Sequence, residues 1–147
     1  TIVLWSGIMK IAEDAGVLTK FASFLKPILS KLFPSVPSNH ASLGYIASNI
    51  AANMLGLGSA ATPFGLRAMS ELQKINSKKD TASNAMITFL VLNTAGVTIV
   101  PTTVLALRIS YGSVNPSEII VPGAIATFCS CIGAVLIDYF IRKRGKN

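Results

Sequence analysis

Charged side chains are scarce in this chain. Asp, Glu, Lys and Arg together make up 13% of its 147 residues, whereas soluble domains carry roughly 25%. Hydrophobic residues make up 51% of the chain, and the mean hydropathy is +0.58. A soluble fold of this size cannot bury so much apolar surface, because its surface is large relative to its volume. The composition therefore predicts an integral membrane protein, with the lipid bilayer as a partner.

Residues suited to catalysis or metal binding are also few. His40 is the only histidine, so no Ser/His/Asp or Cys/His arrangement is available. Cys129 and Cys131 lie in one apolar stretch and are expected to be small core residues, because a metal site needs more ligands nearby. No pair of acids falls inside an apolar stretch, although proton-coupled chemistry usually places one there. We expect no enzyme, no catalytic residue, no metal and no cofactor.

The positive net charge of +7 has a particular distribution. Lys and Arg lie between the apolar stretches and in the C-terminal run from Arg142 to Lys146. This placement suits anionic lipid headgroups and the preference for basic loops on the cytoplasmic side. No stripe of basic and aromatic residues resembles a nucleic-acid platform. The chain is therefore not expected to bind nucleic acid.

Residues 20–33 form an amphipathic pattern. Apolar side chains recur at helical spacing, and Lys20, Lys26 and Lys31 fall away from that stripe. At about 14 residues such a helix is too short to cross a bilayer. It is best interpreted as lying in the membrane interface, with packing against a partner helix as the alternative. Pro27 is expected to kink it.

Three long apolar stretches follow. Residues 41–66 and 81–107 contain no charged side chain, and each is interrupted by Gly and Pro. Residues 119–137 are cleaner, and an ion pair between Asp138 and Arg142 is expected at their end. We predict an all-α, polytopic membrane helical bundle in a single domain, 1–147. Its parts are the amphipathic helix 20–33, a first broken segment 41–75, a second broken segment 81–110 and a transmembrane helix 119–141. A hydrophobic segment is expected to precede Thr1.

The basic residues predict an orientation. Residues 67–81 hold four Lys and Arg, the C-terminal tail holds four, and residues 108–118 hold one. If 81–107 and 119–137 each cross once, the first loop and the tail share the cytoplasmic side of the cell membrane. Residues 41–66 can cross or can re-enter as a hairpin, and the lysines of 20–33 favour the hairpin.

The two interrupted stretches share a plan. The first reads Asn53, Gly56, Pro63 and then Arg67. The second reads Asn93, Gly96, Pro101 and then Arg108. The two asparagines are 40 residues apart, but the later spacings differ, so the pseudo-repeat is weak in sequence.

Membrane physics gives this plan a meaning. Every backbone N–H and C=O in lipid must be paired within the protein. Broken helices are tolerated where they are buried or line a wet cavity, and transporters bind solutes at such breaks. The ligand-binding candidates are the polar and small residues at the breaks: Asn49, Asn53, Gly56, Gly58, Thr62, Asn93, Thr94, Thr102 and Thr103. Pro63, Gly96 and Pro101 are the candidate helix breaks, and Arg67 and Arg108 are possible counter-ions.

Each of these candidates also has a structural interpretation. The neutral polar side chains can cap helix ends or bridge helices, and the glycines can allow close helix packing. The two arginines can extend toward the membrane surface. Purely structural roles are least expected for the three asparagines, because an amide in hydrocarbon is costly without a partner.

The run NMLGLGSAATPFGLRAM from Asn53 to Met69 resembles the signature of the nucleoside-recognition, or Gate, domain. Further matching motifs are ELQK at 71–74, IVPTT at 99–103 and NPSEI at 115–119. Together they resemble the spore maturation protein A family of endospore-forming bacteria, over essentially the whole chain.

The resemblance implies a membrane protein of spore maturation that acts in dehydration of the spore core. It also implies a partner, the sister spore maturation protein B, with a homo-oligomer as the alternative. Two functions remain open from sequence: a transport-like module for a small polar solute, and a structural assembly subunit. Fold-level similarity does not establish the solute.

Overall fold

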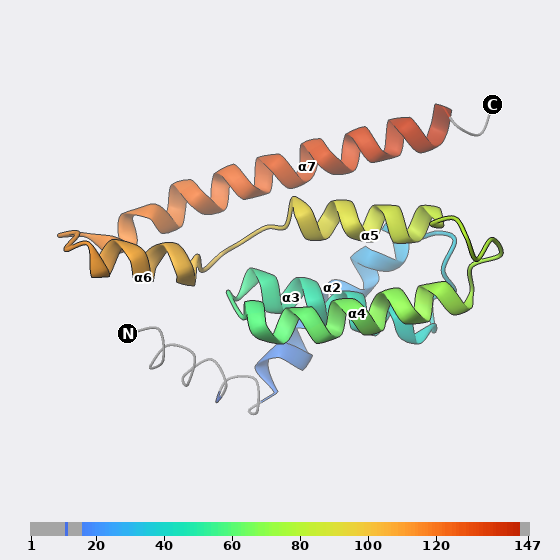
Figure 1. The fold of residues 1–147 in the computed structure, drawn as a ribbon, viewed down its shortest axis with the longest axis horizontal. Coiled ribbons are helices and arrows are strands. Elements are labelled where there is room, and N and C mark those ends of the chain that lie inside the picture. Colours follow the sequence, from blue (N-terminus) through green and yellow to red (C-terminus); the bar gives the residue numbers. More distant parts are fainter. Residues whose placement is uncertain (1–10, 12–15, 145–147) are drawn as a thin grey trace.

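The computed structural model describes Ile11 and residues 16–144. Its elements are α2 (Val17–Leu32), α3 (Ala41–Met54), α4 (Gly58–Lys74), α5 (Asn84–Thr94), α6 (Thr102–Ser110), the 3-10 turn η1 (Pro116–Ile119) and α7 (Ile120–Arg144). Figure 1 shows their arrangement. Only helices and loops occur in these residues, so the predicted all-α class is confirmed for the described part of the chain.

Helix α2 has the predicted amphipathic character. Ala22 and Leu29 are buried, as is Phe33 just after the helix, while the three lysines are exposed. The helix begins after Gly16, and Pro27 lies inside it. Its buried face packs on α3, but Phe24 and Ile28 stay largely exposed.

Helices α3 and α4 form an antiparallel hairpin (Figure 1). His40 caps α3, because its Nδ1 accepts a hydrogen bond from the Ser42 backbone N–H at 3.2 Å. Three alanines of the hairpin are fully buried, Ala47 and Ala51 of α3 and Ala68 of α4. Small side chains of this kind let helix backbones approach closely. The stretch 41–66 therefore turns back on itself between α3 and α4.

The turn of the hairpin lies at residues 55–57. Gly56 has φ of +76°, a left-handed conformation that glycine adopts without the cost other residues incur. Pro63 was the predicted break, but it is the sixth residue of α4 and lies inside that helix. The chain leaves the helical path before Pro63, at the glycine-centred turn.

The second stretch has a different shape. Ser83 caps α5 by accepting a hydrogen bond from the Met86 N–H at 3.4 Å. After Thr94 the chain becomes extended, and Pro101 precedes α6. Figure 1 shows that α6 continues in the direction of α5 and does not fold back on it. One stretch reverses and the other runs on, so the structure does not confirm the pseudo-repeat.

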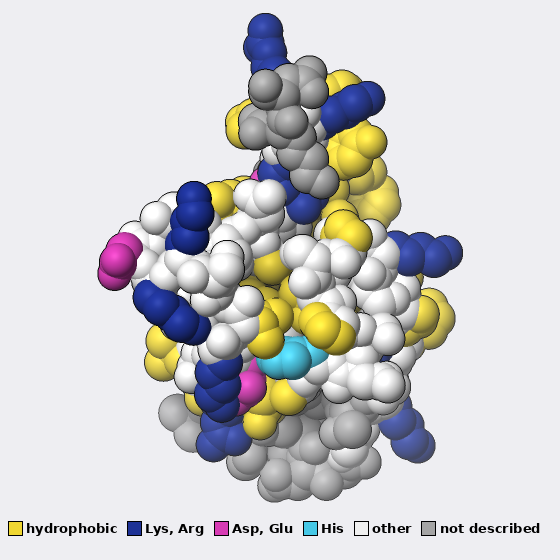
Figure 2. Space-filling model, turned by 90° about the vertical axis from the view of Figure 1, so that its right-hand side faces the viewer, with side chains coloured by type: hydrophobic (Ala, Val, Ile, Leu, Met, Phe, Trp, Pro, Cys, Tyr) yellow, Lys and Arg dark blue, Asp and Glu magenta, His cyan; other side chains and the backbone are white. Residues whose placement is uncertain are grey.

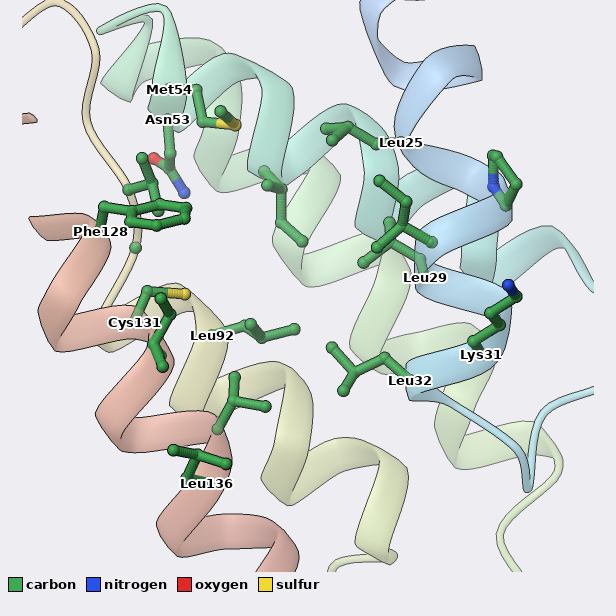
Figure 3. Close-up of a pocket in the computed structure, with 17 residues that line it drawn as sticks. Leu25, Leu29, Lys31, Leu32, Asn53, Met54, Leu92, Phe128, Cys131 and Leu136 are labelled. Atoms are coloured by element: carbon green, nitrogen blue, oxygen red, sulfur yellow. The ribbon is translucent and has the colours of Figure 1, made fainter.

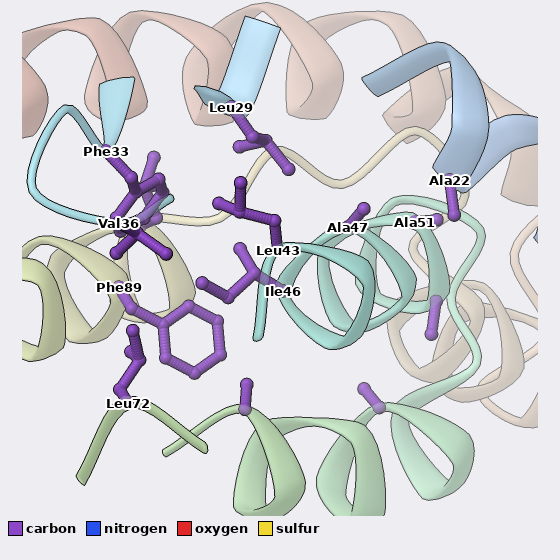
Figure 4. Packing of buried hydrophobic residues seen from close by; sticks show 14 of the residues in the cluster. Ala22, Leu29, Phe33, Val36, Leu43, Ile46, Ala47, Ala51, Leu72 and Phe89 are labelled. Carbon is purple, nitrogen blue, oxygen red and sulfur yellow. The ribbon is translucent and has the colours of Figure 1, made fainter. Parts of the chain in front are cut away.

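The hydrophobic core joins these elements. Phe89 of α5 points between Ile46 of α3 and Leu72 of α4, and Phe33 and Val36 close the same cluster (Figure 4). All five side chains are buried. Burial of such side chains contributes about 1.5–3 kcal/mol each, and this cluster holds α5 on the hairpin.

Helix α7 is the long element. Together with η1 it forms a helical stretch of 29 residues, Pro116–Arg144, whose most hydrophobic 18-residue window has a mean hydropathy of 2.2. In the described residues it is the one helix long and apolar enough to cross a membrane. None of its most hydrophobic window is buried inside the chain, and at about 1.5 Å per residue it reaches across a bilayer core. Its apolar surface suits contact with lipid.

A buried carboxylate of α7, Asp138, connects this helix to α5. The Asp138 carboxylate is 3.1 Å from the Arg142 guanidinium, as the sequence predicted. The same carboxylate accepts a hydrogen bond from the Thr88 hydroxyl of α5 at 2.8 Å. Asp138 is 6% exposed, so its charge depends on these two partners.

Replacing Asp138 tests this contact. Asp138→Ala leaves Arg142 poorly exposed and without its carboxylate, so the protein should lose on the order of 2 kcal/mol or more. The thermal unfolding midpoint in detergent measures the loss. The matched control is Glu118→Ala, because Glu118 is exposed and lies 3.9 Å from Arg108, an arrangement worth at most about 1 kcal/mol. Equal midpoints for the two variants would contradict the role of Asp138.

Candidate solute site at the helix interruptions

The matched asparagines of the two stretches meet in space. The Asn53 side-chain N–H donates to the Asn93 side-chain oxygen at 2.7 Å. Asn53 stands at the end of α3 and Asn93 at the end of α5. Both amides are partly or largely exposed, so their remaining donors and acceptors can reach a ligand.

Asn49 is the support beneath this pair. It is 1% exposed, and its Nδ2 donates to the Ala61 carbonyl of α4 at 2.7 Å. Its Oδ1 lies 3.5 Å from Asn53 Nδ2, a weak contact. Asn49 therefore bridges the two helices of the hairpin, and it does not itself face an open space.

The extended link between α5 and α6, residues 95–101, packs on the tip of the α3–α4 hairpin, residues 55–57. The Met54 carbonyl accepts hydrogen bonds from the N–H groups of Ile99 at 2.9 Å and Val100 at 3.2 Å. The Thr102 hydroxyl donates to the Gly56 carbonyl at 3.2 Å. These carbonyls lie at and beyond a helix C-terminus, where no partner exists within the helix. The link supplies the missing donors.

Glycine is required where the link approaches. A Cβ at Gly56 would lie 2.4 Å from the Val100 carbonyl oxygen and 2.6 Å from the Thr102 side-chain methyl. A Cβ at Gly65 would lie 3.0 Å from Asn49 Nδ2. Sequence reasoning missed Gly65, whose small size makes room for the buried amide. Gly58 has open space around it and opens α4.

A second contact missed by sequence reasoning holds the link to α7. The Thr98 backbone N–H donates to the Thr127 hydroxyl at 3.2 Å, and Thr127 in turn donates to the Gly123 carbonyl of its own helix at 2.9 Å. A threonine within an otherwise apolar segment was the available signal. The link is therefore held on both sides, by the hairpin and by α7.

Other predicted site residues lie apart from the asparagine pair or are directed elsewhere. Thr62 donates weakly to the Gly58 carbonyl of its own helix at 3.4 Å. Within the described residues, Thr94 and Thr103 are exposed and make no side-chain hydrogen bond. Arg67 is exposed on α4. Arg108 donates to the Ser113 hydroxyl at 3.1 Å and to the Asn115 carbonyl at 3.2 Å, so it orders the loop before α7.

A pocket of about 790 Å³ lies beside the asparagine pair. Asn53, Met54 and Phe128 line one end, and Leu32 and Leu136 line the other (Figure 3). Gly96 of the link also lines it. This volume is within the roughly 300–1,000 Å³ of small-molecule sites. The lining is apolar apart from a few groups, and the Asn53 amide is its neutral polar end, with Asn93 next to Asn53 but outside the lining.

Comparison with known proteins adds the family. The model of the family described as Gate, nucleoside recognition, matches residues 1–111. The chain belongs to this family. Spore maturation protein A of Bacillus subtilis strain 168 is 49% identical over 147 residues, which covers 99% of this chain and 75% of that protein. No solved structure matches the chain. The matched region includes both interruptions, and the family agrees with a membrane protein in whose described residues one helix has spanning length.

The close approach at Gly56 gives a stability test. Gly56→Ala places a methyl group against the Val100 carbonyl at positive φ, which should cost about 1–3 kcal/mol. Gly58→Ala is the matched control, because its methyl group enters open space in a helix and should be neutral or stabilising by up to about 1 kcal/mol. Thermal unfolding in detergent compares the two. An unchanged midpoint for Gly56→Ala would show that the link does not dock as described.

Proposed function

We propose that this chain is a multi-pass membrane module that binds a small, neutral polar solute beside the hydrogen-bonded pair of Asn53 and Asn93. The hydrogen bond that joins the two amides supports the proposal, because it places matched polar groups at two interruptions of the helical path. Transporters bind solutes at such interruptions near the middle of the membrane. Each amide carries both donors and acceptors, so the pair suits a ligand that also has both.

The charges near the site favour a neutral solute. Within the described residues no acid lines the pocket, and Lys31 is its one cation. Arg67 lies exposed, and Arg108 is directed to its own loop. A charged solute would need a counter-ion beside the amides.

The cellular role follows from the relative. Spore maturation protein A is named for spore maturation, and we infer the same process here, through dehydration of the spore core. Solute passage is the activity that the site suits. Catalysis is not part of the proposal, because the pocket offers no nucleophile with a neighbouring base.

The alternative is a structural assembly subunit that pairs with spore maturation protein B or with a second copy of itself. The observation that favours it is the exposed apolar face of α7, including Ile125 and Phe140, which another membrane helix can cover. In that case the amide pair only fastens the link to the hairpin.

Amide-to-leucine variants test solute binding. Asn53→Leu and Asn93→Leu remove the pair while leucine stays compatible with lipid, so each should reduce spore-core dehydration to the level of a strain without the protein. Spore buoyant density measures core water, and immunoblots of the membrane fraction verify protein level. Asn115→Leu is the matched control, because Asn115 is an exposed amide in the loop before α7, and it should keep full dehydration.

The same variants separate the two functions. Solute binding predicts that Asn53→Leu loses dehydration yet still co-purifies with spore maturation protein B at the wild-type level. The assembly function predicts that dehydration and co-purification fall together. Full dehydration in both leucine variants would exclude a solute site at the amides.

We further propose that the end of the molecule with the α4–α5 loop and the α7 C-terminus is cytoplasmic. Lys78 and Lys79 lie in that loop, and Arg142, Lys143 and Arg144 lie at the end of α7. Figure 1 places both at the same end, and Figure 2 shows Lys and Arg spread across it. A hairpin at α3–α4 also returns the end of α2 to this side, which agrees with the preference for basic residues in the cytoplasm.

Sided cysteine labelling tests this orientation. In a background with Cys129 and Cys131 replaced by alanine, Val114→Cys should react with an impermeant maleimide in intact cells. Lys78→Cys should react only after the cells are permeabilised. Val114 is 92% exposed in the loop at the opposite end, so access does not limit its labelling. The reverse pattern, or labelling of both from outside, would refute the proposed topology.

A further inference from the structure

The pocket beside the asparagines extends as a groove between two helices that do not meet. Helices α2 and α7 form its walls and make no contact with each other within the described residues. Helices α3 and α5 contact one another and contribute the floor. Figure 3 shows α2 and α7 facing each other across this space.

The walls are aliphatic and poorly covered. Ile28 of α2 is 57% exposed, and Ile132 and Leu136 of α7 are 46% and 51% exposed. These side chains line the groove together with Leu25 and Val135. Asn53 is the only side-chain amide of the lining, and it lies at one end. Most of the groove therefore suits a flexible hydrocarbon chain and has no hydrogen-bonding side chain for a polar solute.

The one charged residue of the lining is a lysine. Lys31, in the last turn of α2, lines the groove and is exposed. The C-terminal end of α2 lies toward the end of the molecule where α7 also ends (Figure 1), and the last turn of α7 contains Lys143 and Arg144. Asp138 is engaged with Arg142 and Thr88, and Glu71 with Lys74. Asp80 is the remaining acid near the α4–α5 loop and is outnumbered by Lys and Arg, so this end carries an excess of positive charge beside an apolar slot.

We propose that the groove binds one anionic phospholipid, with its phosphate at Lys31 and an acyl chain lying along the groove toward Asn53. Basic pockets between membrane helices on the cytoplasmic side select anionic headgroups. The volume of about 790 Å³ is ample for a chain of this kind. The lipid fills the aliphatic part of the groove, while the amide pair stays at its end. The inference does not depend on solute binding.

The positive charge at this end favours an anionic lipid over a second copy of this chain as the occupant of the groove. Helix α7 of another copy inserted in the same orientation would bring Arg142, Lys143 and Arg144 to the end of the groove that holds Lys31. Like charges at close range repel, most strongly where water is scarce. An anionic headgroup has the opposite sign and neutralises the same end.

Native mass spectrometry of the full chain tests the lipid site. The protein is released from nanodiscs that contain equal amounts of phosphatidylglycerol and phosphatidylcholine. We expect one retained phosphatidylglycerol in preference to phosphatidylcholine. Lys31→Gln should lower that retention several-fold, whereas Lys26→Gln should not. Lys26 is the matched control, because it is an exposed lysine of the same helix that does not line the groove.

A groove-filling variant tests the acyl-chain position. Ile132→Trp should displace the retained lipid, while Ile125→Trp, which is exposed on α7 outside the groove, should leave it bound. Equal retention of the two lipids, unaffected by Lys31→Gln, would overturn the proposal in favour of unspecific lipid contact. A dimer that Ile132→Trp dissociates without change in lipid would overturn it in favour of a second copy. The spore phenotype of the asparagine variants plays no part in either outcome.

Discussion

The fold depends on how the hairpin tip satisfies its own backbone. A helix end leaves backbone carbonyls without donors, and burying such a group unpaired costs free energy. Here the Met54 carbonyl takes two N–H groups from the extended link, and the Gly56 carbonyl takes the Thr102 hydroxyl. The pairing that removes this cost also fixes the position of the link. Asn93 thereby comes within hydrogen-bond distance of Asn53.

The two interrupted stretches both leave backbone groups unpaired within their helices, but the chain follows a different path in each. Residues 41–74 reverse at a left-handed glycine, whereas residues 84–110 become extended and then continue in one direction (Figure 1). They share chemistry at the asparagines without sharing a topology. The reversal exposes carbonyls and the extension exposes N–H groups, so each stretch supplies what the other lacks. Helix α7 braces the pair through Thr127 and Asp138.

Structural features that follow from a local sequence pattern could be predicted, whereas features that depend on contacts between distant residues could not. Three features could be predicted from nearby residues alone, and the structure contains all three. They are the apolar stripe of α2, the apolar length of α7 and the ion pair between Asp138 and Arg142. Pro63 indicated a break, because a proline in a helix interior removes a backbone donor, yet it lies inside α4 and the break falls at Gly56. The Thr88–Asp138 and Thr98–Thr127 contacts join residues far apart in the chain, which no spacing rule anticipates. The asparagines could be selected as candidates, but their mutual contact required the fold.

The docking of the link on the hairpin tip also constrains the order of assembly. The chain is made from its N-terminus, so α3 and α4 exist before residues 99 and 100 emerge. Until those residues arrive, the Met54 carbonyl has no donor from the link. The backbone pairing at the hairpin tip is therefore completed only after the second half of the module has been made, so the first half reaches its final structure together with the second.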